Sequence, residues 1–136
     1  MLRAFRTVKK PVPAPGPGRV GEVPAGFIFL RYGSRHVKVA LSEIRYVESR
    51  KNYCRVVTTD RVYMVLARLL DFIEALPSPA FCQVHRSFVV ALSQIASFDA
   101  TNVIIAGEKL PIGGHYRFNL LSAAPVFNPV TRRQRF

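Results

Sequence analysis

The stretch that decides the fold is Phe81-Cys82-Gln83-Val84-His85-Arg86-Ser87-Phe88-Val89-Val90, in which apolar residues surround a polar His-Arg-Ser triplet. Side chains alternate between the two faces of an extended segment. As one extended segment, the stretch places Val84, Phe88 and Val90 on one face and His85, Ser87 and Val89 on the other. It therefore predicts a strand that is buried on apolar neighbours and still carries polar side chains.

The polar triplet needs hydrogen-bond partners, because a buried polar group without one costs about 1–3 kcal/mol. We expect His85 and Ser87 either to brace neighbouring backbone or to meet a ligand. Arg86 is left as a guanidinium fork, a group that suits phosphate oxygens and guanine edges. The triplet thus indicates contact with a nucleic acid.

Short apolar runs separated by turn residues lie on both sides of this stretch, a texture typical of β-strands. Upstream strands are expected at residues 27–32, 36–40, 44–48, 53–59 and 62–65. Downstream strands are expected at residues 94–99, 102–105 and 110–112, joined as successive hairpins. The sequence predicts a mostly β fold of small antiparallel sheets.

Helical spacing occurs in two places. The first is a short helix before Pro77, with one apolar face made of Leu66, Leu69, Leu70, Ile73 and Leu76. The second follows Gly113-Gly114 and covers residues 115–124, with Phe118, Leu120 and Leu121 as its apolar residues.

Three regions of the chain differ in composition and charge. Residues 25–127 form one predicted domain, and the hydrophobic fraction of 49% is that of a globular chain. Residues 1–24 form a Pro/Gly-rich leader with five basic residues and one acidic residue, and residues 128–136 form a tail with three basic residues and none acidic. The domain itself has twelve basic and seven acidic residues, out of 20 and 8 in the whole chain. A net charge of +12 points to a polyanion, with nucleic acid ahead of an anionic membrane surface.

Other classes of function find little support. No apolar run reaches the roughly 18 residues of a membrane helix, and no secretory signal is present, so we expect a cytoplasmic protein without membrane insertion. Cys54 and Cys82 are expected as packed core thiols rather than a disulfide or metal pair. The three histidines are far apart, and Gly113-Gly114 lacks a following phosphate-loop lysine. We expect no enzyme activity, no metal and no cofactor.

Basic residues gather at three places in the predicted fold. These are a strand-to-strand loop with Arg50, Lys51, Asn52 and Tyr53, followed by Arg55; the triplet His85, Arg86 and Ser87; and the last segment with His115, Tyr116 and Arg117. Each place pairs a charge with a side chain that can hydrogen-bond to a base edge. The two tyrosines suit core packing as well as contact with DNA.

The order of these pieces resembles the LytTR DNA-binding domain of bacterial transcription regulators over roughly residues 26–124. The matching motifs are Ile44-Arg45-Tyr46-Val47-Glu48, Asn52-Tyr53, Leu69-Leu70, residues 81–90, Ile95 with Phe98, Leu110-Pro111-Ile112-Gly113 and Tyr116-Arg117. The resemblance implies a stack of small antiparallel sheets with one short helix, whose loops enter successive major grooves. It also implies DNA contacts from the loop around residues 52–54, from the His85-Arg86-Ser87 turn and from residues 115–117.

Some positions depart from the family pattern. Gln83 stands where a basic residue is common, Ala91 where asparagine is common, and Gly114-His115 where one or two arginines are usual. Histidine supplies less positive charge than arginine at neutral pH. Related domains often follow a receiver domain, whereas a Pro-rich leader stands here, so we expect regulation through a partner protein, oligomerisation or abundance.

The sequence therefore predicts a regulator of transcription that binds specific double-stranded DNA and is not an enzyme. We expect Arg86 to read a base, with Asn52 and His115 next, and we expect the phosphates to be positioned by Arg50, Lys51, Arg55 and Arg117. A homodimer on tandem sites is a further expectation. The alternative is an interaction domain of the same fold that binds a partner protein and attracts polyanions without sequence preference.

Overall fold

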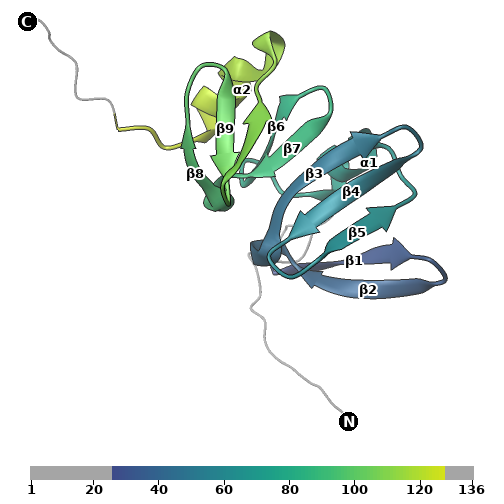
Figure 1. Cartoon of the computed structure of the whole chain (residues 1–136). Coiled ribbons are helices and arrows are strands. Elements are labelled where there is room, and N and C mark those ends of the chain that lie inside the picture. The colour runs from purple at the N-terminus through teal and green to yellow at the C-terminus, as the bar shows by residue number, and fades with distance from the viewer. Residues whose placement is uncertain (1–25, 128–136) are drawn as a thin grey trace, which may run out of the picture.

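The computed structural model describes residues 26–127, so the expected leader at residues 1–24 and the expected tail at residues 128–136 lie outside the described residues. Over this range the chain is mostly β, with short helices (Figure 1). The strands are β1 Phe27–Tyr32, β2 Arg35–Ala40, β3 Ile44–Arg50, β4 Tyr53–Thr58, β5 Val62–Val65, β6 Phe81–His85, β7 Phe88–Ala91, β8 Ile95–Phe98, β9 Asn102–Ile105 and β10 Glu108–Pro111. The helices are η1 Leu41–Glu43, α1 Leu69–Ala75, η2 Leu92–Gln94, η3 Gly114–Tyr116 and α2 Arg117–Ala123.

The strands form three antiparallel sheets. The central sheet has five strands in the order β5-β4-β3-β7-β6, and it is flanked by the β1–β2 hairpin and by a sheet in the order β10-β9-β8. Figure 1 shows the β1–β2 hairpin beside β5, and the three-stranded sheet with α2 beyond β6 and β7. The predicted stack of small antiparallel sheets is confirmed.

The two faces of the central sheet bury two separate cores. Val47, Val56 and Val89 pack with α1 and the β1–β2 hairpin on one face. Tyr46 and Val90 pack with β9, β10 and α2 on the other. Because strand side chains alternate, each central strand contributes to both cores.

A β-bulge at Arg45 sets which side chains of β3 face each of these two cores. Ile44 pairs with Thr58 and Tyr46 pairs with Val57, so Arg45 is the extra residue on β3. The bulge lets Ile44 and Val47, three residues apart, reach the same core.

The residues 81–90 form a hairpin rather than one extended segment. β6 pairs with β7, and Arg86-Ser87 forms the turn between them. The alternation of side chains alone describes one extended segment, whereas the chain reverses at the polar triplet, where the family resemblance implies a turn. The predicted division of faces holds all the same: Val84 and Val90 lie in the second core, with Phe88 packed against it, and Val89 lies in the first.

The apolar faces of both helices differ from the predicted ones. Asp71 accepts a hydrogen bond from the Arg68 backbone N–H at 2.9 Å, and this cap starts α1 at Leu69. Leu66 precedes the helix and is 82% exposed, and Leu70 is exposed as well, whereas Phe72 is buried. In α2, Leu120 is buried while Phe118 and Leu121 are exposed. A short helix against a sheet buries only one narrow stripe.

Candidate nucleic-acid interface

Two of the three predicted contact places lie at the same end of the central sheet. β3 pairs with both β4 and β7, and Glu48 stands opposite Phe88 at the start of β7. The Ser49 backbone N–H donates to the Ser87 backbone oxygen at 2.9 Å. The β3–β4 turn at residues 51–52 is therefore next to the β6–β7 turn at residues 86–87 (Figure 1).

The third place joins them through the residues before α2. The Gly113 N–H donates to the Val84 backbone oxygen at 2.8 Å, which holds η3 against β6. A Cβ at residue 113 would lie 3.1 Å from the Tyr116 ring and 3.7 Å from the His85 Cα atom. Glycine at this position leaves room for the Tyr116 ring beside the β6–β7 hairpin. The structure thus brings together residues 50–53, 85–87 and 114–117.

The β6–β7 turn is braced by its own histidine. The Ser87 backbone N–H donates to His85 Nδ1 at 3.1 Å, and the Gln83 amide donates to the His85 backbone oxygen at 3.2 Å. The His85 ring also meets the Phe88 ring, with centroids 5.6 Å apart. The sequence left two roles open for His85. These contacts are those of a side chain that braces the backbone of the turn. Arg86 is exposed at the tip of the turn.

The β3–β4 turn has a strained backbone. Lys51 has a φ of 44°, a left-handed conformation that costs a residue with a side chain about 1–2 kcal/mol. Lys51 and Asn52 are both exposed. Tyr53, where β4 begins, is half-buried, as is Tyr116.

A carboxylate binds the two arginines that flank this turn. Glu48 Oε1 accepts from Arg55 Nη1 at 2.5 Å, and Glu48 Oε2 accepts from Arg50 Nε at 3.4 Å. The hydrogen bond to Glu48 raises the pKa of Arg55 above its ordinary value, and the Tyr46 phenol adds to this effect. The Arg55 side chain is thus engaged within the fold.

The Tyr46 phenol lies close to the Arg55 guanidinium. Its hydroxyl donates to Glu108 Oε1 at 2.7 Å, linking the central sheet to β10. Burial, then the hydrogen bond to Glu108, raise the pKa of Tyr46 to about 12. The phenol is therefore neutral at physiological pH and acts as a donor.

The last segment is exposed and partly tied to a neighbouring loop. Arg117 Nε donates to the Ala100 backbone oxygen at 3.0 Å, while His115 is exposed. Residues 50–53, 85–87 and 114–117 contain four arginine or lysine side chains and no acid. This combination of exposed cations and amide or imidazole groups at one end of a sheet is what contact with a nucleic acid requires.

The family model described as the LytTr DNA-binding domain matches residues 34–123. The chain belongs to the LytTR DNA-binding domain family. A solved structure similar to it is the LytTr DNA-binding domain of a Bacillus cereus protein described as a methyl-accepting/DNA response regulator. The two share a TM-score of 0.62 and 21% sequence identity, and the match covers 72% of this chain and 95% of that one. No curated protein matches the chain.

Two features of this LytTR domain were missed by sequence reasoning. One is Glu48 as the partner of Arg50 and Arg55; the signal was its position two residues before Arg50 on one strand face. The other is Gly113, which permits close packing of Tyr116.

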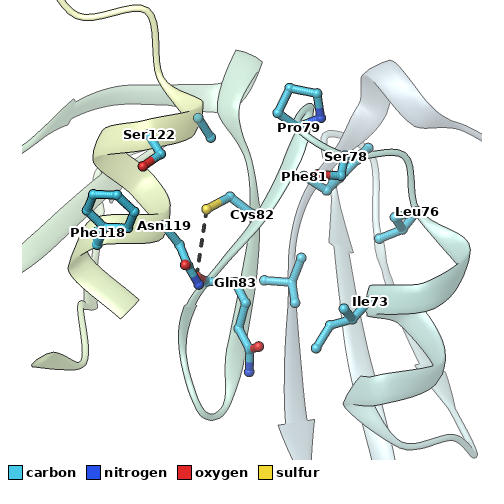
Figure 2. Close-up of a pocket in the computed structure, with 12 residues that line it drawn as sticks. Ile73, Leu76, Ser78, Pro79, Phe81, Cys82, Gln83, Phe118, Asn119 and Ser122 are labelled. Carbon is cyan, nitrogen blue, oxygen red and sulfur yellow. Dashed lines mark hydrogen bonds between the residues drawn. The ribbon is translucent and has the colours of Figure 1, made fainter. Parts of the chain in front are cut away.

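A cleft lies behind the interface of the LytTR domain, between α1 and α2 across β6 (Figure 2). It measures about 420 Å³, and its lining includes Ile73, Phe81, Cys82, Phe118 and Asn119 but no charged residue. Burial raises the pKa of the Cys82 thiol above its ordinary value. Cys54 and Cys82 are both buried, as expected of core thiols.

Residues 26–127 contain no group of three His, Cys, Asp or Glu side chains that could hold a metal ion. No helix within these residues is long and apolar enough to span a bilayer.

Proposed function

We propose that this LytTR domain is a transcription regulator that binds specific double-stranded DNA and inserts its loops into the major groove. The observation that carries the proposal is that three segments far apart in sequence meet at one end of the central sheet, joined by the hydrogen bonds of Ser49 and Gly113. Each segment presents an exposed side chain that can read a base: Asn52, Arg86 and His115.

The residues divide into readers and anchors. Arg86 is the principal reader, because its turn is fixed by His85 and guanidinium groups bond bidentately to guanine. Lys51 and Arg117 anchor the phosphates, and Ser87 helps to shape the turn. Arg50 and Arg55 stand beside Glu48, so their share in phosphate binding depends on that carboxylate.

Two copies of the domain would bind tandem sites cooperatively, since one domain presents a single set of three segments. Such a regulator acts on chromosomal DNA, which in a bacterium places it in the cytoplasm. Regulation would then come from a partner protein or from pairing on DNA.

The test is selection of bound duplexes from a random pool by the full chain at about 150 mM salt, because affinity for DNA depends steeply on salt. We expect one motif to be enriched, and its enrichment to persist when residues 1–22 are removed. Tandem copies of the motif with a fixed spacing would report cooperative pairing.

The alternative is an interaction domain that attracts polyanions without reading sequence. It is favoured by the internal partners of Arg55 and Arg117, which occupy guanidinium donors that DNA phosphates would otherwise use. Absence of any enriched motif, with binding that vanishes as salt rises or as the tails are removed, would support this alternative and overturn the proposed function.

A further inference from the structure

Glu48 lies at the centre of a small charge cluster on the DNA end of the central sheet. Arg50 follows it by two residues on β3, on the same face, and Arg55 is its directly paired neighbour on β4. The Glu48 side chain is only 20% exposed, so the cluster is partly shielded from water.

The carboxylate divides its two oxygens between the two arginines. Oε1 accepts from Arg55 Nη1 and Oε2 accepts from Arg50 Nε. Phosphate oxygens use the same guanidinium donors in the same geometry. The Glu48 carboxylate therefore competes with the DNA backbone for both arginines.

The two arginines are held with different strength. The Arg55 side chain is 27% exposed and makes the short bond, whereas the Arg50 side chain is 50% exposed and makes a single bond of 3.4 Å. Loss of the Glu48 charge would free Arg50 first, because Arg50 stands at the end of β3 beside the exposed Lys51.

We propose that Glu48 is a specificity-determining residue of the DNA contact, whose carboxylate withholds Arg50 and Arg55 from phosphates and so weakens binding to random duplex. This inference rests on the proposed function. Phosphate contacts strengthen binding to every sequence alike, and base contacts strengthen binding to the correct site. An acid that withholds two cations from phosphates thus lowers the affinity for random duplex. Discrimination between sequences then depends on Arg86, and the ratio of specific to random affinity rises.

The first variant is Glu48→Gln, which keeps the size and the acceptor oxygen of the side chain but removes its charge. Its affinity for random duplex is measured between 50 and 200 mM salt. One freed arginine adds a slope of about 0.9 in log affinity against log salt, so the affinity ratio between these salt concentrations grows about 3.5-fold. We also expect higher affinity for random duplex at low salt and a lower specificity ratio.

The matched control is Asp60→Asn. Asp60 pairs with Arg61 at 3.5 Å beyond the far end of β4, and both side chains are well exposed. This change adds the same charge and frees one arginine, but away from the three contact segments. We expect a smaller change in salt slope than in Glu48→Gln; an equal change would mean that net charge alone is responsible and would overturn the inference.

Two further variants keep the test decisive should Glu48→Gln fold poorly. Arg50→Gln alone is expected to leave the salt slope for random duplex unchanged, because Glu48 already holds that side chain. Adding Arg50→Gln to Glu48→Gln is expected to restore the original slope. A shallower slope in Arg50→Gln alone, or an unchanged slope in folded Glu48→Gln, would overturn the role of Glu48.

These outcomes are independent of whether a specific motif exists. If selection finds no motif, the proposed function fails, whereas the slopes on random duplex still report whether Glu48 withholds Arg50. If a motif exists and the slopes do not move, the proposed function stands and the role of Glu48 fails.

Discussion

The β3–β4 and β6–β7 turns have the same length and lie side by side, yet they hold their cations in different ways. In the first, Lys51 takes a strained left-handed backbone and Arg50 is bound to an acid. In the second, His85 fixes the backbone from within, and no ion pair to Arg86 is present among the described residues. A fixed backbone can aim a guanidinium at one base, so we propose that the second turn reads sequence and that the exposed Lys51 of the first turn contacts phosphates.

Arg86→Ala should have the largest effect on the difference between the two turns. We expect it to cost about 1–3 kcal/mol of binding free energy on a selected site and to blur selectivity, because a bidentate base contact is lost. Random duplex should lose far less. Competition binding with selected and scrambled duplexes measures both, and equal losses on the two would refute the division of roles.

The buried Tyr46 phenol on β3 gives the second largest effect. Tyr46 is only 4% exposed, and its pKa is raised from 10.0 to about 12, so the folded state favours the neutral form. The contribution of this phenol to the free energy of unfolding is complete below pH 10 and is lost as the pH rises through 12. At about 1.4 kcal/mol per pKa unit, this amounts to about 2–3 kcal/mol.

Urea unfolding of wild type and Tyr46→Phe at several alkaline pH values measures this contribution as a difference. Cys54, whose pKa burial raises to about 11, contributes with the same sign and is common to both proteins. The stability of Tyr46→Phe should fall less steeply above pH 10. Parallel curves would mean that the Tyr46 phenol titrates alike in the folded and unfolded states.

His85→Ala should loosen the second turn by about 1–2 kcal/mol of unfolding free energy. The variant loses the hydrogen bond from the Ser87 N–H and the contact with the Phe88 ring. Affinity for a selected site should fall, though less than in Arg86→Ala, because the guanidinium is still present. His115→Ala, at an exposed histidine, is the control and should leave stability unchanged.

Lys51→Gly should change stability and DNA binding in opposite directions and so separate the two roles of the first turn. Glycine relieves the left-handed strain, and the unfolding free energy should rise by about 0.5–1 kcal/mol. Binding to selected and random duplex should weaken alike, with a salt slope shallower by about 0.9. Ala106→Gly, at a φ of 51° in the β9–β10 turn, should stabilise without changing binding.

The strands could be predicted because alternation with a period of two survives wherever one face is buried, as at Val37 and Val39. The reversal at Arg86-Ser87 does not follow from the residue pattern, because this turn contains none of the Asn-Gly or Asp-Gly pairs that usually mark a two-residue hairpin. It was expected only from the resemblance to the LytTR family. The start of α1 was missed because the capping contact of Asp71 outweighs the apolar spacing that includes Leu66.

The contact residues were predicted as three separate groups, from charge and from the family resemblance. Their meeting depends on the pairing of β3 with β7 and on the bond from Gly113 to Val84, both of which are long-range contacts. The burial of Leu120 rather than Phe118 likewise depends on how α2 lies across β6, which helical periodicity alone does not fix.

Strand β6 is the last strand of the central sheet, and an open strand edge invites pairing with other chains and aggregation. Here the free side of β6 already makes hydrogen bonds within the fold. The Phe81 N–H donates to the Pro77 backbone oxygen. The Gln83 backbone oxygen accepts from the Asn119 side-chain amide, and the Val84 backbone oxygen accepts from the Gly113 N–H. Gly113 and Asn119, which flank the proposed third contact segment at residues 114–117, thus also shield the sheet from intermolecular β-pairing. A bulky substitution at Gly113 would therefore be expected to lower solubility as well as DNA binding.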